Sequence, residues 1–178
     1  MTRPEGQFER AKDASTVYVF AYGSNMLTTR IQQRVAGARP LTTGYVRERR
    51  LTFHKRGADG SAKADATFTG QSSDRVWGVV FAMHRSEKQT LDKYEGAYNS
   101  ELAVVCVEGG ELEVSIYVAE EAAIDRSLRP YAWYHRFVIA GAEEHRLPED
   151  YVQRIQRQPS VTDPDRERRQ QALQLLGD

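Results

Sequence analysis

The chain has very little cysteine and no long apolar run. Its 178 residues include one cysteine, Cys106, so it cannot form a disulfide within itself. Cys106 lies in the apolar run 102–107, which favours a buried, inert thiol over a nucleophile, because reactive cysteines need a positively charged, partly exposed setting. No run approaches the roughly 20 apolar residues of a membrane span, and residues 1–14 lack the apolar core of a secretory signal. We therefore expect a cytoplasmic protein without a membrane partner.

The chain also lacks an excess of charge and the usual signatures of metal or phosphate sites. Lysine plus arginine and aspartate plus glutamate number 25 each, whereas proteins that bind nucleic acid usually carry a basic surplus. The four histidines, His54, His84, His135 and His145, form no i, i+4 pair and have no cysteine nearby. No G-x-S-x-G turn and no G-x-x-x-x-G-K loop occurs. The sequence therefore predicts no nucleic-acid partner, no metal and no cofactor.

Length and composition suit one globular domain, with 40% hydrophobic and 28% charged residues. We expect a flexible leader over residues 1–15 and a single domain over 16–178. Strand patterns fill the first two thirds and helical patterns the last third, which favours the α+β class over alternating β-α-β units. About six strands in so small a domain favour a closed or nearly closed mixed β-barrel, because closure removes exposed strand edges.

The strand predictions rest on apolar or alternating runs rich in β-branched and aromatic residues. The run 17–22 is apolar throughout, as expected of a strand that is buried on both faces. A glycine pair at 109–110 separates the last two predicted strands and indicates a hairpin. The other predicted strands are 46–54, 64–69, 75–83, 101–107 and 111–119, with a polar loop over 56–63.

Capping residues and helical spacing predict two helices in the first part of the chain. A short helix follows Gly23, with Asn25 as its N-cap. Ser86 and Gln89 match a capping box and predict a helix to about Tyr94, with Gly96 in a left-handed C-terminal position.

Three more helices are predicted towards the C-terminus. One covers 131–141, a second begins in its first turn at Pro148, and the third opens with Asp163 as cap and Pro164 at its first position. The sequence leaves open whether this last helix packs on its own domain or on a partner chain.

The turn after the first strand is a candidate binding site. Gly23 lets the backbone turn sharply and lets a ligand approach closely. The amides of Ser24, Asn25 and Met26 would then point outward at a helix start, where they attract an anion or a developing oxyanion. Many strand-glycine-helix segments are ordinary turns, so this pattern alone leaves both interpretations open.

Glu95 is the candidate acid and base. The sequence places it at the C-terminal end of a helix, where the helix dipole disfavours a negative charge. A carboxyl group withdrawn from water in such a place suits proton transfer near neutral pH. An exposed carboxylate there would be an ordinary solvated side chain, and its position alone does not decide between the two.

Four segments in order carry a resemblance to known proteins: FAYGSNM at 20–26, VWGVVF at 76–81, LDKYEG at 91–96 and residues 134–151. Together they resemble the γ-glutamyl cyclotransferase-like (AIG2-like) family, over roughly residues 17–160. The segment 134–151 resembles the C-terminal part of the branch that acts on γ-glutamyl amino acids and peptides, which the branch acting on γ-glutamylamines lacks.

This resemblance implies a small β-barrel flanked by helices and a cofactor-free enzyme with a small-molecule γ-glutamyl substrate. It implies release of an amine or amino acid and formation of 5-oxoproline, a reaction of glutathione metabolism. Glu95 would be the proton acceptor, and Tyr134 would contact the substrate. The substrate-binding segment would comprise Phe20, Ala21, Tyr22, Gly23, Ser24 and Asn25.

The implied chemistry agrees with the residues. The substrate's own α-amine attacks its own γ-carbonyl, so the protein mainly has to fold the substrate into a reactive conformation. A single carboxylate can accept the proton of the α-ammonium and later return it to the leaving nitrogen.

Two alternatives to this enzyme stay open: a non-catalytic ligand-binding barrel, and a related enzyme that removes a γ-glutamyl group from a specialised metabolite. Tyr94 and residues 97–100 are expected to shape the leaving-group pocket. The basic loop 55–63 either lines the site and pairs with a substrate carboxylate or is solvated. The sequence does not choose between a monomer and a homodimer, and it names neither the physiological substrate nor the pathway.

Overall fold

The computed structural model describes residues 14–177, so most of the expected leader lies outside the described residues. Five strands form a closed barrel in the order β1-β5-β2-β6-β7, and two more form a separate sheet. The predicted α+β class with a small β-barrel is confirmed, with two of the strands standing outside the barrel. The barrel strands are β1 (Thr16–Ala21), β2 (Arg39–Arg47), β5 (Arg75–His84), β6 (Tyr98–Val107) and β7 (Gly110–Ala119), and the separate sheet consists of β3 (Arg49–Arg56) and β4 (Ala62–Phe68).

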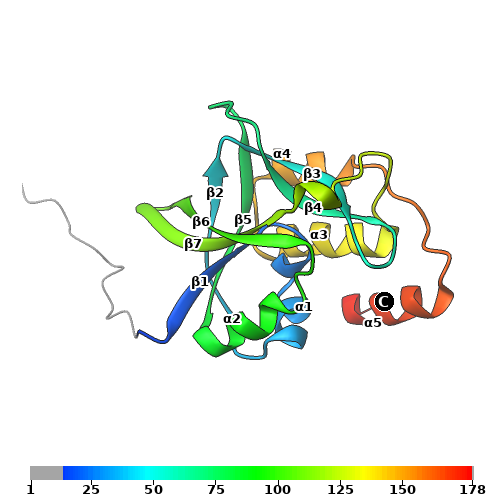
Figure 1. The fold of residues 1–178 in the computed structure, drawn as a ribbon, viewed down its shortest axis with the longest axis horizontal. Helices are drawn as coiled ribbons and strands as arrows, with labels where there is room; N and C mark the ends of the chain where they lie inside the picture. The colour runs from blue at the N-terminus through cyan, green and yellow to red at the C-terminus, as the bar shows by residue number, and fades with distance from the viewer. Residues whose placement is uncertain (1–13, 178) are drawn as a thin grey trace, which may run out of the picture.

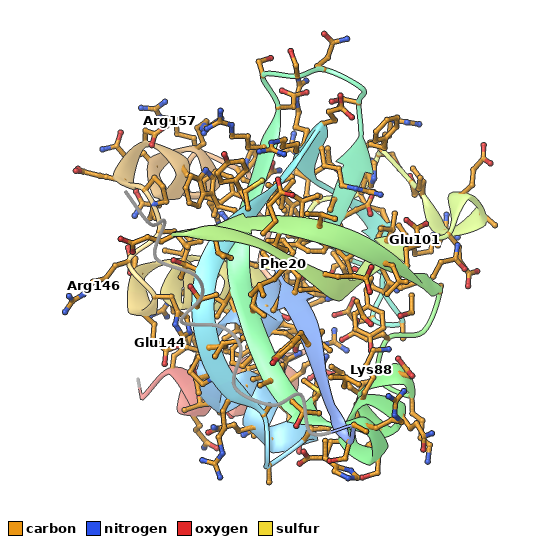
Figure 2. All side chains as sticks on the ribbon, turned by 90° about the vertical axis from the view of Figure 1, so that its left-hand side faces the viewer. Phe20, Lys88, Glu101, Glu144, Arg146 and Arg157 are labelled. Atoms are coloured by element: carbon orange, nitrogen blue, oxygen red, sulfur yellow. The ribbon has the colours of Figure 1, made fainter. Side chains whose placement is uncertain are left out.

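The first strand closes the barrel. β1 pairs antiparallel with β5 along its whole length, and its residues Val19 and Phe20 pair in parallel with β7. Because both edges of β1 are paired, its middle is fully enclosed, and Phe20 lies at the centre of the barrel (Figure 2). The continuous apolar run read from the sequence fits this position.

The predicted strand 46–54 is wrong in its boundaries. Glu48 adopts a left-handed backbone with φ of 59°, and the chain turns there from β2 into β3. β3 pairs with β4 outside the barrel, and the two strands lie close to α3 (Figure 1). Sequence alternation could not show this break, because glutamate is not a residue that usually marks a left-handed turn.

The first helices differ from the prediction in their starts. A 3₁₀ turn, η1 (Ser24–Met26), precedes α1 (Thr28–Arg34). Leu27 occupies the N-cap position of α1 without a side-chain hydrogen bond, so the prediction that Asn25 caps this helix is wrong. The Asn25 side chain bonds instead to Glu95 and Arg34.

The helix α2 (Arg85–Asp92) is capped by His84, not by Ser86 as predicted. The His84 ring accepts the Ser86 amide, and Glu87 accepts the His84 amide in return. The helix ends at Asp92, before the predicted Tyr94. Ala97, not Gly96, has the left-handed backbone after it, with φ of 60°.

The C-terminal third forms a short 3₁₀ turn, η2 (Glu121–Ala123), and three helices. α3 packs against η1, α4 and α5, and Figure 1 shows α5 beside α3 at the edge of the molecule. Pro148 is the N-cap of α4 and not its first residue. The three helices are α3 (Ala132–Glu144), α4 (Glu149–Gln156) and α5 (Arg166–Leu176).

Asp165, not the predicted Asp163, caps α5. Asp163 is buried instead, where its carboxylate accepts hydrogen bonds from Trp133 Nε1 at 2.8 Å and Arg168 Nε at 2.6 Å. Leu175 and Leu176 also pack against the core. The last helix therefore packs on its own domain, through α3.

One close approach between elements depends on a glycine. A Cβ on Gly141 of α3 would lie 2.5 Å from the Leu27 nitrogen and 2.6 Å from the Met26 Cβ. The absence of a side chain therefore lets α3 pack directly on the backbone that follows β1. The predicted burial of Cys106 is confirmed. Within residues 14–177, no helix is both long enough and apolar enough to cross a membrane.

Candidate active site

A cavity of about 460 Å³ lies where the end of β1, the turn after it, α1, the β3–β4 loop, the segment between α2 and β6, and α3 meet. Every site residue predicted from the sequence lies in its wall, so the fold brings together positions that are far apart in the chain. The functional roles assigned to these residues stay predictions. They are Phe20, Ala21, Tyr22, Gly23, Ser24, Asn25, Glu95 and Tyr134.

Glu95 lies in the segment between α2 and β6. Its amide donates to the Asp92 carbonyl, and its own carbonyl accepts the Tyr98 amide, both at 3.2 Å. Its side chain is only 11% exposed. Asn25 Nδ2 at 2.8 Å and Arg34 Nη1 at 2.9 Å both donate to Oε1, and no described residue donates to Oε2. One carboxylate oxygen is thus fixed, and the other is available to a ligand.

Arg34, in the last turn of α1, is a site residue that sequence reasoning missed. Its guanidinium bonds to Glu95 and also donates to Asn25 Oδ1 at 3.1 Å. The same group lies 5.3 Å from the centroid of the Tyr94 ring. One signal in the sequence could have drawn attention to it: Arg30 and Arg34 stand one helical turn apart, directly after the predicted binding turn.

The turn at Gly23 leaves little space around its backbone. A Cβ there would lie 3.0 Å from the Ala64 Cβ and 3.3 Å from the Tyr134 hydroxyl oxygen. The expectation that three amides of this turn face outward is wrong for Met26, whose amide donates to the Gly23 carbonyl at 3.0 Å. The amides of Ser24 and Asn25 precede this first hydrogen bond of the turn and so are not used by it.

Tyr134, from α3, stands against this turn. Its hydroxyl oxygen accepts the Ala64 amide at 3.0 Å. Burial raises the pKa of Tyr134, although the bond from the Ala64 amide opposes the shift. The phenol therefore keeps its proton at neutral pH, and because the Ala64 amide donates to its oxygen, the O–H remains a donor.

The basic loop 55–63 contributes two lysines to the cavity wall. Lys63 Nζ donates to Asp59 Oδ2 at 2.7 Å and to Ser61 Oγ at 2.9 Å. Lys55 Nζ donates to the Gly96 carbonyl at 2.6 Å. Burial lowers the pKa of both lysines. Of the two interpretations of this loop, lining of the cavity is the one that the structure favours.

The histidines serve structural contacts. Residues 14–177 contain no group of three or more His, Cys, Asp and Glu side chains that could hold a metal ion. His54 Nε2 lies 2.8 Å from Asp65 Oδ2 in a buried pair that joins β3 to β4. Asp65 Oδ1 also accepts the Ala119 amide at 2.9 Å, so this pair fixes the hairpin against β7. The hairpin in turn holds the loop that lines the cavity.

Comparison with known proteins agrees with this architecture. The model of the AIG2-like family matches residues 75–155, which include Glu95 and Tyr134. A γ-glutamylcyclotransferase from Bos taurus is 30% identical in an alignment of 158 positions, and the match covers 82% of this chain and 80% of the bovine protein. The Homo sapiens γ-glutamylcyclotransferase is 29% identical in an alignment of 155 positions, and the match covers 80% of this chain and 79% of the human protein. A solved γ-glutamyl cyclotransferase structure shares the fold, with a TM-score of 0.79, 24% identity and coverage of 89% of this chain and 98% of that one.

The fold and these relatives define an enzyme of the γ-glutamyl cyclotransferase type. The chain belongs to the γ-glutamyl cyclotransferase family, whose sequence model is described as AIG2-like.

Proposed function

We propose that this chain cleaves a γ-glutamyl amide by intramolecular cyclisation. The substrate's α-amine attacks its γ-carbonyl carbon, the bond from that carbon to the leaving nitrogen breaks, and 5-oxoproline and an amine or amino acid are released. The observation that carries the proposal is a shielded carboxylate, Glu95, in one cavity with the Gly23 turn and Tyr134.

Glu95 is proposed as the proton carrier. Its Oε1 is fixed by Asn25 and Arg34, which leaves Oε2 to accept a proton from the substrate's α-ammonium group. After attack, the same oxygen returns that proton to the leaving nitrogen as the carbon–nitrogen bond breaks. It then accepts the second proton that the attacking nitrogen must lose to become the lactam N–H, and this proton leaves on the released amine, which departs as an ammonium group, so Glu95 ends the cycle as a carboxylate. No second acid or base is required.

The turn and Tyr134 are proposed to stabilise the oxygen that becomes negative when the γ-carbonyl is attacked. The Ser24 and Asn25 amides and the Tyr134 O–H are donors, and fixed donors of this kind stabilise an oxyanion without reorganisation. Phe20, Ala21 and Tyr22 form the adjoining wall. Because the attack is intramolecular, holding the glutamyl chain in a curved conformation supplies much of the rate enhancement.

The alternatives differ in ways that an experiment can separate. A binding-only barrel does not need a carboxylate held in place by an arginine and an amide, and this arrangement favours the enzyme. An enzyme for a specialised γ-glutamyl metabolite shares the mechanism and differs only in its leaving group. Lys93 and the 55% exposed Tyr94 line the cavity and are proposed to contact that group.

The test is 5-oxoproline release from γ-glutamyl dipeptides, γ-glutamylamines and glutathione, measured for the parent protein and Glu95→Gln. We expect the substitution to reduce turnover by about 10²-fold or more, because a proton carrier contributes at least that much. Glu113→Gln, at an exposed position of β7, is the matched control and should keep parental turnover. Full turnover in Glu95→Gln would contradict the mechanism, and binding of a γ-glutamyl ligand without turnover over hours would favour the binding-only barrel.

A further inference from the structure

Arg30 is a cation in the cavity wall that the proposed chemistry leaves without a role. It lies one helical turn before Arg34 on α1 and faces the same cavity. Its guanidinium carbon lies 4.8 Å from the centroid of the Phe137 ring. Its Nε is buried and has no hydrogen-bond partner among the described residues.

The other buried cations of the cavity are satisfied within the protein. Arg34 bonds to Glu95, Lys63 to Asp59 and Lys55 to the Gly96 carbonyl. These bonds make the lysines of the basic loop poor candidates for binding a substrate anion, because a ligand would have to displace an existing partner. Arg30 has no such partner to displace among residues 14–177.

A guanidinium in a partly buried wall costs free energy when one of its donors lacks a hydrogen-bond partner, unless a ligand supplies that partner. A buried donor without a partner costs free energy, and a guanidinium presents a planar set of donors that matches both oxygens of a carboxylate. Burial lowers the pKa of Arg30 to about 10, so the group remains cationic at neutral pH. The site is therefore suited to an anion with the shape of a carboxylate.

We infer that Arg30 binds the α-carboxylate of the γ-glutamyl group, an inference that rests on the proposed function. Any γ-glutamyl substrate carries this carboxylate regardless of its leaving group, and the 5-oxoproline product retains it. Arg30, Glu95 and Tyr134 line the same cavity, so Arg30 lies near the groups proposed to act on the same glutamyl moiety. Arg30 would thus anchor one end of the chain that must curl back on itself.

The first experiment pairs variants of Arg30 with substrates that lack one carboxylate each. The substrates are γ-glutamyl-alanine, its analogue with an α-carboxamide, and γ-glutamyl-ethylamide, whose leaving group has no carboxylate. The variants are Arg30→Met and Arg30→Lys, with Arg157→Met as the control at the exposed C-cap position of α4 (Figure 2). Melting curves establish that each variant is folded.

We expect the parent protein to prefer γ-glutamyl-alanine over the α-carboxamide by about 10- to 100-fold in kcat/KM, the range for a hydrogen bond to a charged group. Arg30→Met should abolish this preference by raising KM for the carboxylate substrate alone, and Arg30→Lys should restore part of it. If the preference survives in Arg30→Met, the inference is wrong. If Arg30→Met instead abolishes a preference for γ-glutamyl-alanine over γ-glutamyl-ethylamide, Arg30 binds the leaving group, and the assignment to the α-carboxylate is wrong.

A second experiment does not depend on turnover. L-5-oxoproline is titrated calorimetrically into the parent protein, Glu95→Gln, Arg30→Met and Arg157→Met. We expect binding to be weaker by about 10-fold or more in Arg30→Met than in Arg157→Met, which should bind like the parent. If binding of 5-oxoproline depends on Arg30 but the protein turns over no substrate, the carboxylate site is supported and the proposed function is wrong. Equal binding in Arg30→Met and in the parent, together with normal turnover, would reject the inference alone.

Discussion

Arg34 connects three residues of the cavity wall through a single guanidinium. It bonds to Glu95 and Asn25, and it lies over the Tyr94 ring. Because Asn25 also bonds to Glu95, the three side chains hold one another in a closed set of contacts. We interpret Arg34 as a positioning residue that fixes the proposed proton carrier and does not itself touch the substrate.

Replacement of Arg34 by methionine should therefore lower kcat more than it changes KM. Loss of a hydrogen bond to a charged group costs about 1.5–3 kcal/mol, which corresponds to roughly a 10- to 100-fold lower kcat. Arg34→Lys should recover part of the activity because it keeps the charge. Steady-state kinetics would measure both constants, with Arg39→Met, at an exposed position of β2, as the control. An unchanged kcat in a folded Arg34→Met protein would show that Glu95 needs no such support.

At the residue scale, the sequence could predict those site residues that lie beside a local signal. Gly23 marks a turn, and the resemblance at 91–96 points to Glu95. Arg34 was missed because its partner Glu95 is 61 positions away, and an arginine on a helix usually faces solvent. Arg30, one helical turn before Arg34, was missed because it too looks like an ordinary arginine of a helix surface. Only the folded chain shows which arginines turn inward.

At the scale of elements, the contact of α3 with η1 determines where the Gly23 turn lies. Gly141→Ala would gain up to about 1 kcal/mol of helix propensity. It would also place a Cβ 2.5 Å from the Leu27 nitrogen, and because that atom belongs to the backbone, it cannot rotate away. Overpacking of this kind costs about 1–3 kcal/mol, so we expect a net loss of stability.

The same substitution should impair turnover, since η1 carries Ser24 and Asn25. Urea unfolding and kcat/KM would be measured on Gly141→Ala and on Gly110→Ala, where a Cβ meets nothing within 4 Å. A stability for Gly141→Ala equal to or above that of the parent would mean that α3 can move away from η1 at no cost.

The elements themselves were predictable, whereas their ends were not. Apolar runs indicated the barrel strands and α3, because burial of these runs follows directly from their composition. The predicted N-caps of α2 and α5 are wrong for two different reasons. His84 is not a common capping residue, and Asp163, which is one, is recruited by Trp133 from another element. Tertiary contacts thus decide between neighbouring candidates that look equivalent in the sequence.

At the scale of the whole molecule, Asp163 joins the last helix to the domain. The hydrogen bonds from Arg168 and Trp133 hold the pKa of Asp163 well below its usual range, so the folded state stabilises the ionised form. This stabilisation is fully present above the unfolded pKa of about 3.9 and is lost as the pH falls towards the lower folded pKa. The native domain should therefore become less stable in acid.

Asp163→Asn should remove this dependence. At pH 7 we expect it to lower the free energy of unfolding by about 1–3 kcal/mol, and the difference from the parent should shrink as the pH falls from 5 to 3. Thermal melts across that range would measure it. Asp150→Asn, whose side chain is 79% exposed in its pair with Arg154, is the control. A difference that stays constant with pH would exclude the ion pair as its source.

The closure of the barrel also constrains how the protein is made. β1 is synthesised early, but one of its two neighbours is β7, and the Tyr22 hydroxyl reaches a carbonyl 95 residues further along the chain. Until that part emerges from the ribosome, an apolar strand lacks one partner and can pair with another chain. Tyr134, which completes the cavity, is made later still. A truncated product would thus be both inactive and prone to aggregate, and cells have reason to shield the nascent chain until α3 has emerged.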